Sequence, residues 1–152
     1  MKNQLGHLKR VFILLAHGFE EGPLIYCVNQ LRQTGIPVQL VSLTEELVSS
    51  KHGVSVKGDM LLSELDSAVP KEGLLLFPGG EHATASLLTD PRTHHLIKTI
   101  NSNNGYMVAM ETAVPMLNEF DIPESFACRF IQKCKNQDII QFSSQLIQQF
   151  SN

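Results

Sequence analysis

A glutamate stands where a strand-like segment of the sequence meets a helix-like one. The apolar run Tyr106–Met110 ends at Glu111, and the residues after it, with Pro115 among them, suit the first turn of a helix. A sharp strand-to-helix turn presents its side chain to a pocket, with the free N–H groups of the helix behind it. Those groups and the helix dipole favour negative charge. The sequence therefore places a carboxylate where an anion is stabilised.

Two further segments with chemically capable side chains also follow apolar runs. One is His17–Glu21 and the other is Gly79–His82. Ligands of open α/β sheets bind at the carboxyl ends of the strands, which share one edge. We therefore expect a pocket formed by His17, Glu20, Glu21, Gly79, Gly80, Glu81, His82, Glu111 and Thr112.

Several roles are open for Glu111. It could cap its helix and do nothing else, act as a built-in anion, or work as a catalytic carboxylate with His17 or His82. A metal site combining those histidines with Glu21 or Glu81 is a fourth reading, but no diagnostic spacing such as HExxH supports it. We expect no metal and no cofactor.

The elements that must position these residues can be read from hydrophobic periodicity. Val11–Ala16 is a continuous apolar run, typical of a strand buried on both faces of a parallel sheet. A helix over Pro23–Thr34, stopped by Gly35, and a strand over Ile36–Val41 complete a βαβ unit. Such a unit is right-handed in nearly all proteins.

The rest of the chain repeats the alternation of strands and helices. We expect a hairpin over His52–Met60, strands over Leu74–Phe77 and Tyr106–Met110, a helix beginning at Asp90-Pro91 and ending near Asn101, a short strand at Ile139-Ile140, and a terminal helix over Ser143–Phe150. This pattern predicts an α/β fold with three layers: a doubly wound, mainly parallel sheet with helices on both faces. We expect residues 1–152 to form a single domain.

Composition excludes several classes of function. The net charge of −3 and the scattered Lys and Arg residues argue against nucleic-acid binding. The run Val11–Ala16 is too short to span a membrane, and we expect a cytoplasmic protein. The three cysteines, Cys27, Cys128 and Cys134, lack metal-site spacing and are expected to be reduced thiols, with Cys27 packed inside its helix.

Four blocks of the sequence resemble the PfpI/DJ-one superfamily. They are LLAHGFEE, HGVSVKGDMLLSELD, LLLFPGGEHA and GYMVAMETAVPML, in family order from Val11 to about Asn118. The resemblance implies a flavodoxin-like, glutamine-amidotransferase-like fold, of which the C-terminal part is abbreviated here. It also implies a homodimer.

The same resemblance implies a chemistry that this chain lacks the residues to perform. Family members place a nucleophilic cysteine at this strand-to-helix turn, which we call the elbow. A glutamate hydrogen-bonds the thiol of that cysteine, and a histidine follows the elbow in the sequence. Here Glu111 takes the elbow position and Pro23 the glutamate position, and all six histidines precede Glu111. In cysteine-bearing relatives, N–H donors at the elbow and the Gly-Gly turn form an oxyanion hole. A carboxylate at Glu111 resembles a cysteine oxidised to sulfinate.

We therefore expect a pseudoenzyme, that is, a non-catalytic, small-molecule-binding, regulatory or stress-associated member of this family. One alternative is a divergent enzyme of glyoxalase, deglycase or amidohydrolase type that uses Glu111 with His17 or His82. Another is a structural partner of an intact paralogue.

Overall fold

A parallel sheet forms the centre of the computed structural model, which describes residues 10–65, 73–103, 105–110, 112–118, 130–133 and 139–151. Within these ranges the sheet has the strand order β5-β2-β1-β6-β7-β8. The strands are β1 (Arg10–Leu15), β2 (Val38–Ser42), β5 (Met60–Leu61), β6 (Gly73–Phe77), β7 (Tyr106–Met110) and β8 (Phe130–Lys133). All their pairings are parallel. The expected parallel sheet is confirmed.

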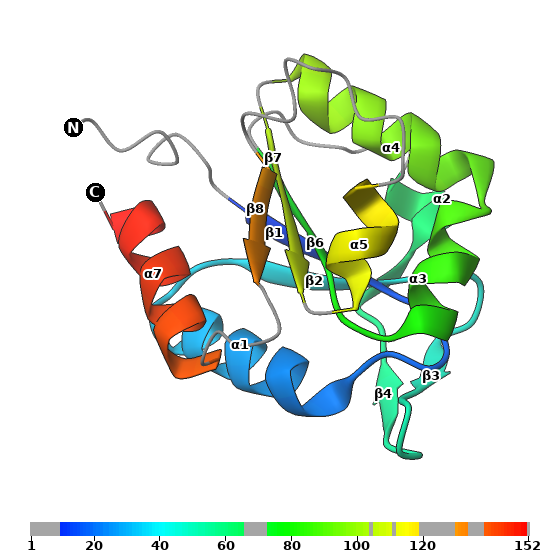
Figure 1. Ribbon diagram of the computed structural model, residues 1–152, viewed down its shortest axis with the longest axis horizontal. Coiled ribbons are helices and arrows are strands. Elements are labelled where there is room, and N and C mark those ends of the chain that lie inside the picture. The colour runs from blue at the N-terminus through cyan, green and yellow to red at the C-terminus, as the bar shows by residue number, and fades with distance from the viewer. Residues whose placement is uncertain are drawn as a thin grey trace.

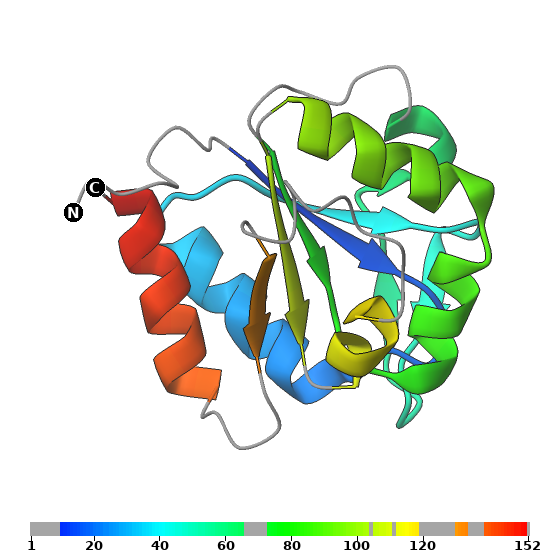
Figure 2. The same ribbon diagram turned by 45° about the horizontal axis from the view of Figure 1, so that its top comes forward.

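Helices cover both faces of this sheet (Figures 1 and 2). On one face α1 (Glu21–Gln33) lies beside α7 (Ile139–Ser151), and on the other α3 (Glu81–Leu88) and α4 (Pro91–Ser102) follow each other. The chain leaves β1 toward β2 but leaves β6 toward β7, in the opposite direction across the sheet. Right-handed crossovers in opposite directions place their helices on opposite faces. The chain therefore switches direction between β1 and β6, where open sheets bind ligands.

The sheet interior explains why the strands read as unbroken apolar runs. Every residue of β6 and β7 is buried, and only the first residue of β1 is exposed. In a strand that is covered on both faces, polar and apolar residues do not alternate, because neither face meets water. Cys27 lies in this core, fully buried, and burial raises the pKa of its thiol to about 12. The expectation that Cys27 is packed is confirmed, whereas Cys128 and Cys134 lie outside the described residues.

A small hairpin stands away from the main sheet at the lower right of Figure 1. It pairs β3 (Leu47–Ser49) with β4 (Ser55–Lys57) antiparallel, so it begins earlier in the sequence than the predicted range. Gly53 turns the hairpin with a φ of 85°.

Two helices begin where the sequence signals predict. Asp90 accepts a hydrogen bond from the backbone N–H of Arg92 at 2.8 Å, as expected of a residue that precedes a helix beginning with proline. Helix α5 (Ala113–Asn118) carries Pro115 in its first turn, as predicted.

Some elements differ from the sequence-based expectation. Ile139 and Ile140, predicted as a strand, begin helix α7, whose apolar stripe extends through them. Helices α2 (Leu62–Leu65) and α3 were not predicted, because each is short and follows directly on a strand or a Gly-Gly turn. No helix in the described parts of the chain is long and apolar enough to cross a membrane.

Candidate functional site

The loops after β1, β6 and β7 meet at the carboxyl edge of the sheet. The backbone N–H of Glu20 donates to the carbonyl oxygen of Gly79 at 2.9 Å, which joins the first two loops. The backbone N–H of Gly80 donates to the hydroxyl oxygen of Thr112 at 2.5 Å, which joins the second to the third. Because the parallel strands end at the same edge of the sheet, the loops that follow them are in contact, as the sequence predicted.

Close approach between the first two loops requires glycine at Gly80. Its φ is 117°, and a Cβ there would collide with the carbonyl oxygen of Gly18 and lie 3.1 Å from the Cα of Phe19. Both obstacles are backbone atoms, which cannot rotate away as a side chain does. A Cβ on the preceding Gly79 would lie 2.5 Å from Oε2 of Glu20, so the Glu20 carboxylate lies directly against this turn.

The β3–β4 hairpin holds the first loop from its other side. The backbone N–H of Gly18 donates to the carbonyl oxygen of Ser49 at 2.8 Å, and that of Lys51 donates to the carbonyl oxygen of Phe19 at 2.8 Å. Phe19 itself is fully buried. Backbone bonds on one flank and the Gly79–Gly80 turn on the other thus fix the position of the loop.

Both ring nitrogens of His17 are engaged. The Nδ1 atom accepts a hydrogen bond from the backbone N–H of Ser49 at 3.1 Å. An imidazole that accepts at Nδ1 carries its proton on Nε2, and Nε2 lies 3.4 Å from Oε2 of Glu45. One ring nitrogen of His17 is therefore held by the hairpin backbone, and the other lies near the exposed Glu45 carboxylate.

A pocket of about 160 Å³ opens between the ends of β1 and β2 and the first turns of α3. Its apolar lining comes from Leu15, Ala16, Leu43 and Val48, and its polar lining from His17, Thr44, Glu45, His82 and Ser86. Thr112 and Gly80 are not among these residues. The pocket is therefore distinct from the elbow that follows β7.

Glu21 lies apart from this pocket, at the start of α1. Its Oε1 atom contacts Nδ1 of His52 at 2.7 Å, which ties the helix to the turn of the hairpin. Hydrogen bonding from its own backbone N–H holds the pKa of Glu21 below its usual value; partial desolvation opposes this effect, and Ser50 and then His52 assist it. Glu21 thus serves as a connection between elements.

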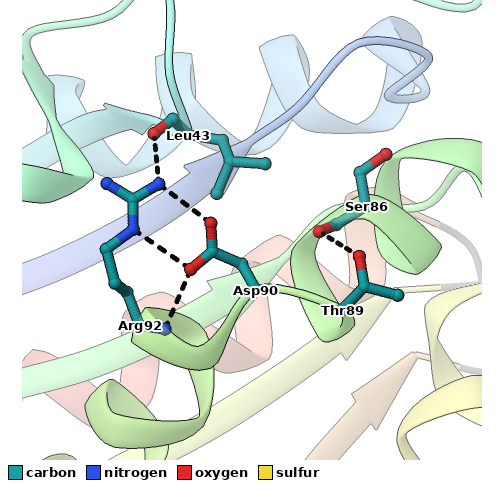
Figure 3. A network of polar contacts seen from close by, with 5 residues as sticks. All are labelled: Leu43, Ser86, Thr89, Asp90 and Arg92. Carbon is teal, nitrogen blue, oxygen red and sulfur yellow. Dashed lines mark hydrogen bonds and ion pairs between the residues drawn. The ribbon is translucent and has the colours of Figure 1, made fainter.

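A polar network at the turn between α3 and α4 supports one wall of the pocket (Figure 3). The Arg92 guanidinium donates to both carboxylate oxygens of Asp90, at 3.0 and 2.8 Å, and to the carbonyl oxygen of Leu43 at 3.3 Å. These hydrogen bonds from Arg92 lower the pKa of Asp90. Because Leu43 lines the pocket, Arg92 fixes the chain at the end of β2 against the helical layer.

The predicted site residues thus separate into different environments. His17 and His82 line the pocket. Glu20, in the loop after β1, contacts the Gly79–Gly80 turn, and Thr112 accepts the N–H of Gly80. Glu81 is exposed in the first turn of α3. Glu111 lies outside the described residues. Within the described ranges no three His, Cys, Asp or Glu side chains are grouped closely enough to hold a metal ion.

Sequence reasoning missed the contribution of the segment after β2. Glu45, Thr44 and Val48 line the pocket, and Ser49 binds His17. The rule that placed the other loops at the carboxyl edge applies equally to β2, so Thr44 and Glu45 could have been found by it. The contact made by Ser49 could not, because it depends on how the hairpin folds back.

Comparison with proteins of known sequence identifies relatives of about half of the chain. A deglycase of Thermococcus kodakarensis is 36% identical over 72 residues, which are 47% of this chain and 42% of that protein. The deglycase PfpI of Pyrococcus furiosus is 35% identical over 72 residues, with the same shares. These matches span less than half the length of either relative.

Solved structures extend the likeness to nearly the whole fold. Oxidised DJ-1 of Toxoplasma gondii has a TM-score of 0.79 at 19% identity, covering 91% of this chain and 89% of that one. DJ-1beta of Drosophila melanogaster has a TM-score of 0.76 at 18% identity, covering 94% and 90%. The model of the DJ-1/PfpI family matches residues 9–126. The chain belongs to the DJ-1/PfpI family.

Proposed function

We propose that this chain is a non-catalytic member of its family, a small-molecule-binding or regulatory module whose elbow after β7 has lost the cysteine chemistry. The resemblance aligns Glu111 with the nucleophilic cysteine and Pro23 with the glutamate that pairs with its thiol. Pro23 lies in the first turn of α1 and has no side-chain group that could accept or donate a proton.

The hydrogen bond between Gly80 and Thr112 carries this proposal. Reactions at such an elbow build negative charge on a substrate oxygen, and backbone N–H groups of the Gly-Gly turn stabilise that charge. Here the N–H of Gly80 points to the hydroxyl oxygen of Thr112, 2.5 Å away. A single N–H shared with a second acceptor gives each a weaker bond. Loss of one such donor costs on the order of 100–1,000-fold in rate in a serine protease.

The described histidines add support. The divergent-enzyme alternative needs His17 or His82 as a proton carrier next to Glu111. The Nδ1 atom of His17 already accepts the N–H of Ser49, and its Nε2 atom lies 3.4 Å from Glu45 in the segment after β2. His82, in the first turn of α3, lines the pocket together with residues at the ends of β1 and β2.

Restoring the family's nucleophile tests the role assigned to Thr112. In the variant Glu111→Cys the introduced thiol should give little hydrolysis of p-nitrophenyl acetate, because the Gly80 N–H stays with Thr112. In Glu111→Cys with Thr112→Ala that donor is released, and hydrolysis should rise about tenfold or more. Thr112→Ala alone is the matched control and should remain at background.

Two outcomes would count against the proposal. Equal hydrolysis by the single and double variants would mean that the Thr112 hydroxyl does not withhold the donor. Hydrolysis by Thr112→Ala alone would mean that the natural elbow, with Glu111 in place, can react once the donor is free. The second outcome would favour the divergent-enzyme alternative.

A further inference from the structure

We propose that the pocket between His17 and His82 binds small primary amines as ammonium ions, with Glu45 as the counter-charge. This inference rests on the proposed function, in that it assigns a ligand class to a chain that binds without reacting. The pocket lies at the ends of β1 and β2, against α3, and shares none of its lining with the contact between Gly80 and Thr112.

The size and floor of the pocket limit the ligand. Its volume is about 160 Å³, close to the roughly 150 Å³ cavity of an engineered lysozyme that binds benzene. A ligand of about six non-hydrogen atoms therefore fits. Leu15, Ala16, Leu43 and Val48 line the pocket, so a short hydrocarbon chain would contact apolar side chains there.

The charge of the pocket favours a cation. The Nδ1 atom of His17 accepts the N–H of Ser49, so the ring proton lies on Nε2, which is 3.4 Å from Oε2 of Glu45. The Glu45 carboxylate is then the lining group that brings a full charge to the pocket. Among the described residues its second oxygen, Oε1, has no partner and can accept hydrogen bonds from an ammonium group.

Further acceptors lie in the same lining. The hydroxyl of Ser86 donates its proton to the carbonyl oxygen of His82 at 3.0 Å, which leaves the lone pairs of Ser86 Oγ for a ligand. Thr44 and His82 also line the pocket, and both side-chain types can accept hydrogen bonds. An ammonium group brings three donors and no acceptor, which matches this set.

Helix α3 supplies the opposing electrostatic effect. Its N-terminus carries roughly half a positive charge, and His82 lies in its first turn. Glu81 in the same turn brings a full negative charge that outweighs it. Glu46 follows Glu45 in the loop and adds another. The Arg92 guanidinium beside Leu43 is paired with Asp90, so it does not offset these carboxylates. A carboxylate ligand should therefore bind weakly.

A series of three ligands with one carbon skeleton tests the charge preference. The probes are 3-methylbutylamine, 3-methylbutan-1-ol and 3-methylbutanoate, titrated into the full chain in phosphate buffer, which contains no competing amine. Binding is followed by calorimetry and by NMR shifts of the histidine ring protons. The amine should bind about tenfold or more tightly than the alcohol, and the carboxylate should bind most weakly. Shifts should be largest at His17 and His82.

A matched pair of variants tests the role of Glu45. Glu45→Gln should weaken amine binding about tenfold or more, whereas Glu46→Gln, which removes the same charge one residue away, should change it less than about threefold. Equal losses in the two variants, tighter binding of the carboxylate, or no amine binding would overturn the proposal. The titration does not involve the elbow. A failure to bind amines would therefore not contradict the proposed lack of turnover. Substrate turnover at the elbow would not contradict amine binding in the pocket.

Discussion

The Thr112 hydroxyl group is the acceptor for the backbone N–H of Gly80 in the Gly-Gly turn. Gly80 is buried, and its N–H finds its acceptor in Thr112 Oγ1. A buried donor that loses its partner costs about 1–3 kcal/mol. We therefore expect Thr112→Val, which keeps the shape and removes the acceptor, to lower the free energy of unfolding by that amount.

Thr112→Ser is the control for this change, because it keeps the oxygen and should stay within about 1 kcal/mol of the wild type. Urea denaturation at neutral pH measures both. A valine variant as stable as the serine variant would show that the hydrogen bond between Gly80 and Thr112 contributes nothing to folding.

Glu21 should make the stability of the chain depend on pH in a defined direction. Its pKa is lower in the folded state, chiefly through hydrogen bonding from its own backbone N–H, against partial desolvation, and then through Ser50 and His52. A lowered carboxyl pKa contributes stability that is fully present above the unfolded-state pKa and is lost as pH falls through the folded-state value. Glu21→Gln should therefore lower the urea midpoint at pH 7 and leave it unchanged near pH 3.

Glu46→Gln, which changes an exposed carboxylate, is the comparison for that series. A deficit in Glu21→Gln that persists undiminished in acid would mean that shape, and not charge, links Glu21 to the hairpin.

At the scale of elements, the packing of the first two loops depends on the backbone of the Gly79–Gly80 turn. Gly80→Ala would place a Cβ against backbone atoms of Gly18 and Phe19 at a φ of 117°. Gly53 also has a positive φ, 85°, but a Cβ there meets nothing within 4 Å. Strain alone costs about 1–3 kcal/mol, so Gly53→Ala should fall in that range and Gly80→Ala should exceed it. Thermal unfolding of the two variants tests this order, and equal costs would contradict the described contact.

The elements that could be predicted are those with strong local signals. Tyr106–Met110 is an unbroken apolar run between turn signals, and Asp90-Pro91 is a strong helix start, so both were predicted correctly. Ile139-Ile140 was predicted wrongly, because two β-branched residues without their neighbours do not distinguish a strand from the first turn of an amphipathic helix. A local hydrophobic pattern distinguishes a helix from a strand only when the pattern is long enough to show its period.

The candidate site shows the same division. That the loops after β1, β6 and β7 meet follows from the rule for parallel strands. That Gly80 donates to Thr112, and Ser49 to His17, depends on distances that only the packed chain defines. Glu45 follows β2, so the same rule could have predicted it. The contacts made by the hairpin could not have been predicted in this way.

At the scale of the whole molecule, we expect two copies of the chain to associate. Large apolar side chains are exposed on α1 at Ile25, 44% accessible, and on the hairpin at Leu47, 60% accessible, and Val54, 47% accessible. Light scattering should give about twice the chain mass of 16.9 kDa. Leu47→Glu should shift the mass toward one chain if the hairpin takes part, because a carboxylate there would be desolvated. A single-chain mass for the wild type at high micromolar concentration would contradict the expectation.

The central claim, that this family member binds but does not turn over substrate, is tested most directly by the methylglyoxal consumption of the wild-type chain. The relatives named deglycases make a reactive dicarbonyl a fitting probe. The account predicts consumption no faster than in protein-free buffer, unchanged by iodoacetamide and identical in Glu111→Gln. Consumption well above buffer that Glu111→Gln abolishes would contradict it, because that variant keeps the shape of the side chain and removes the base.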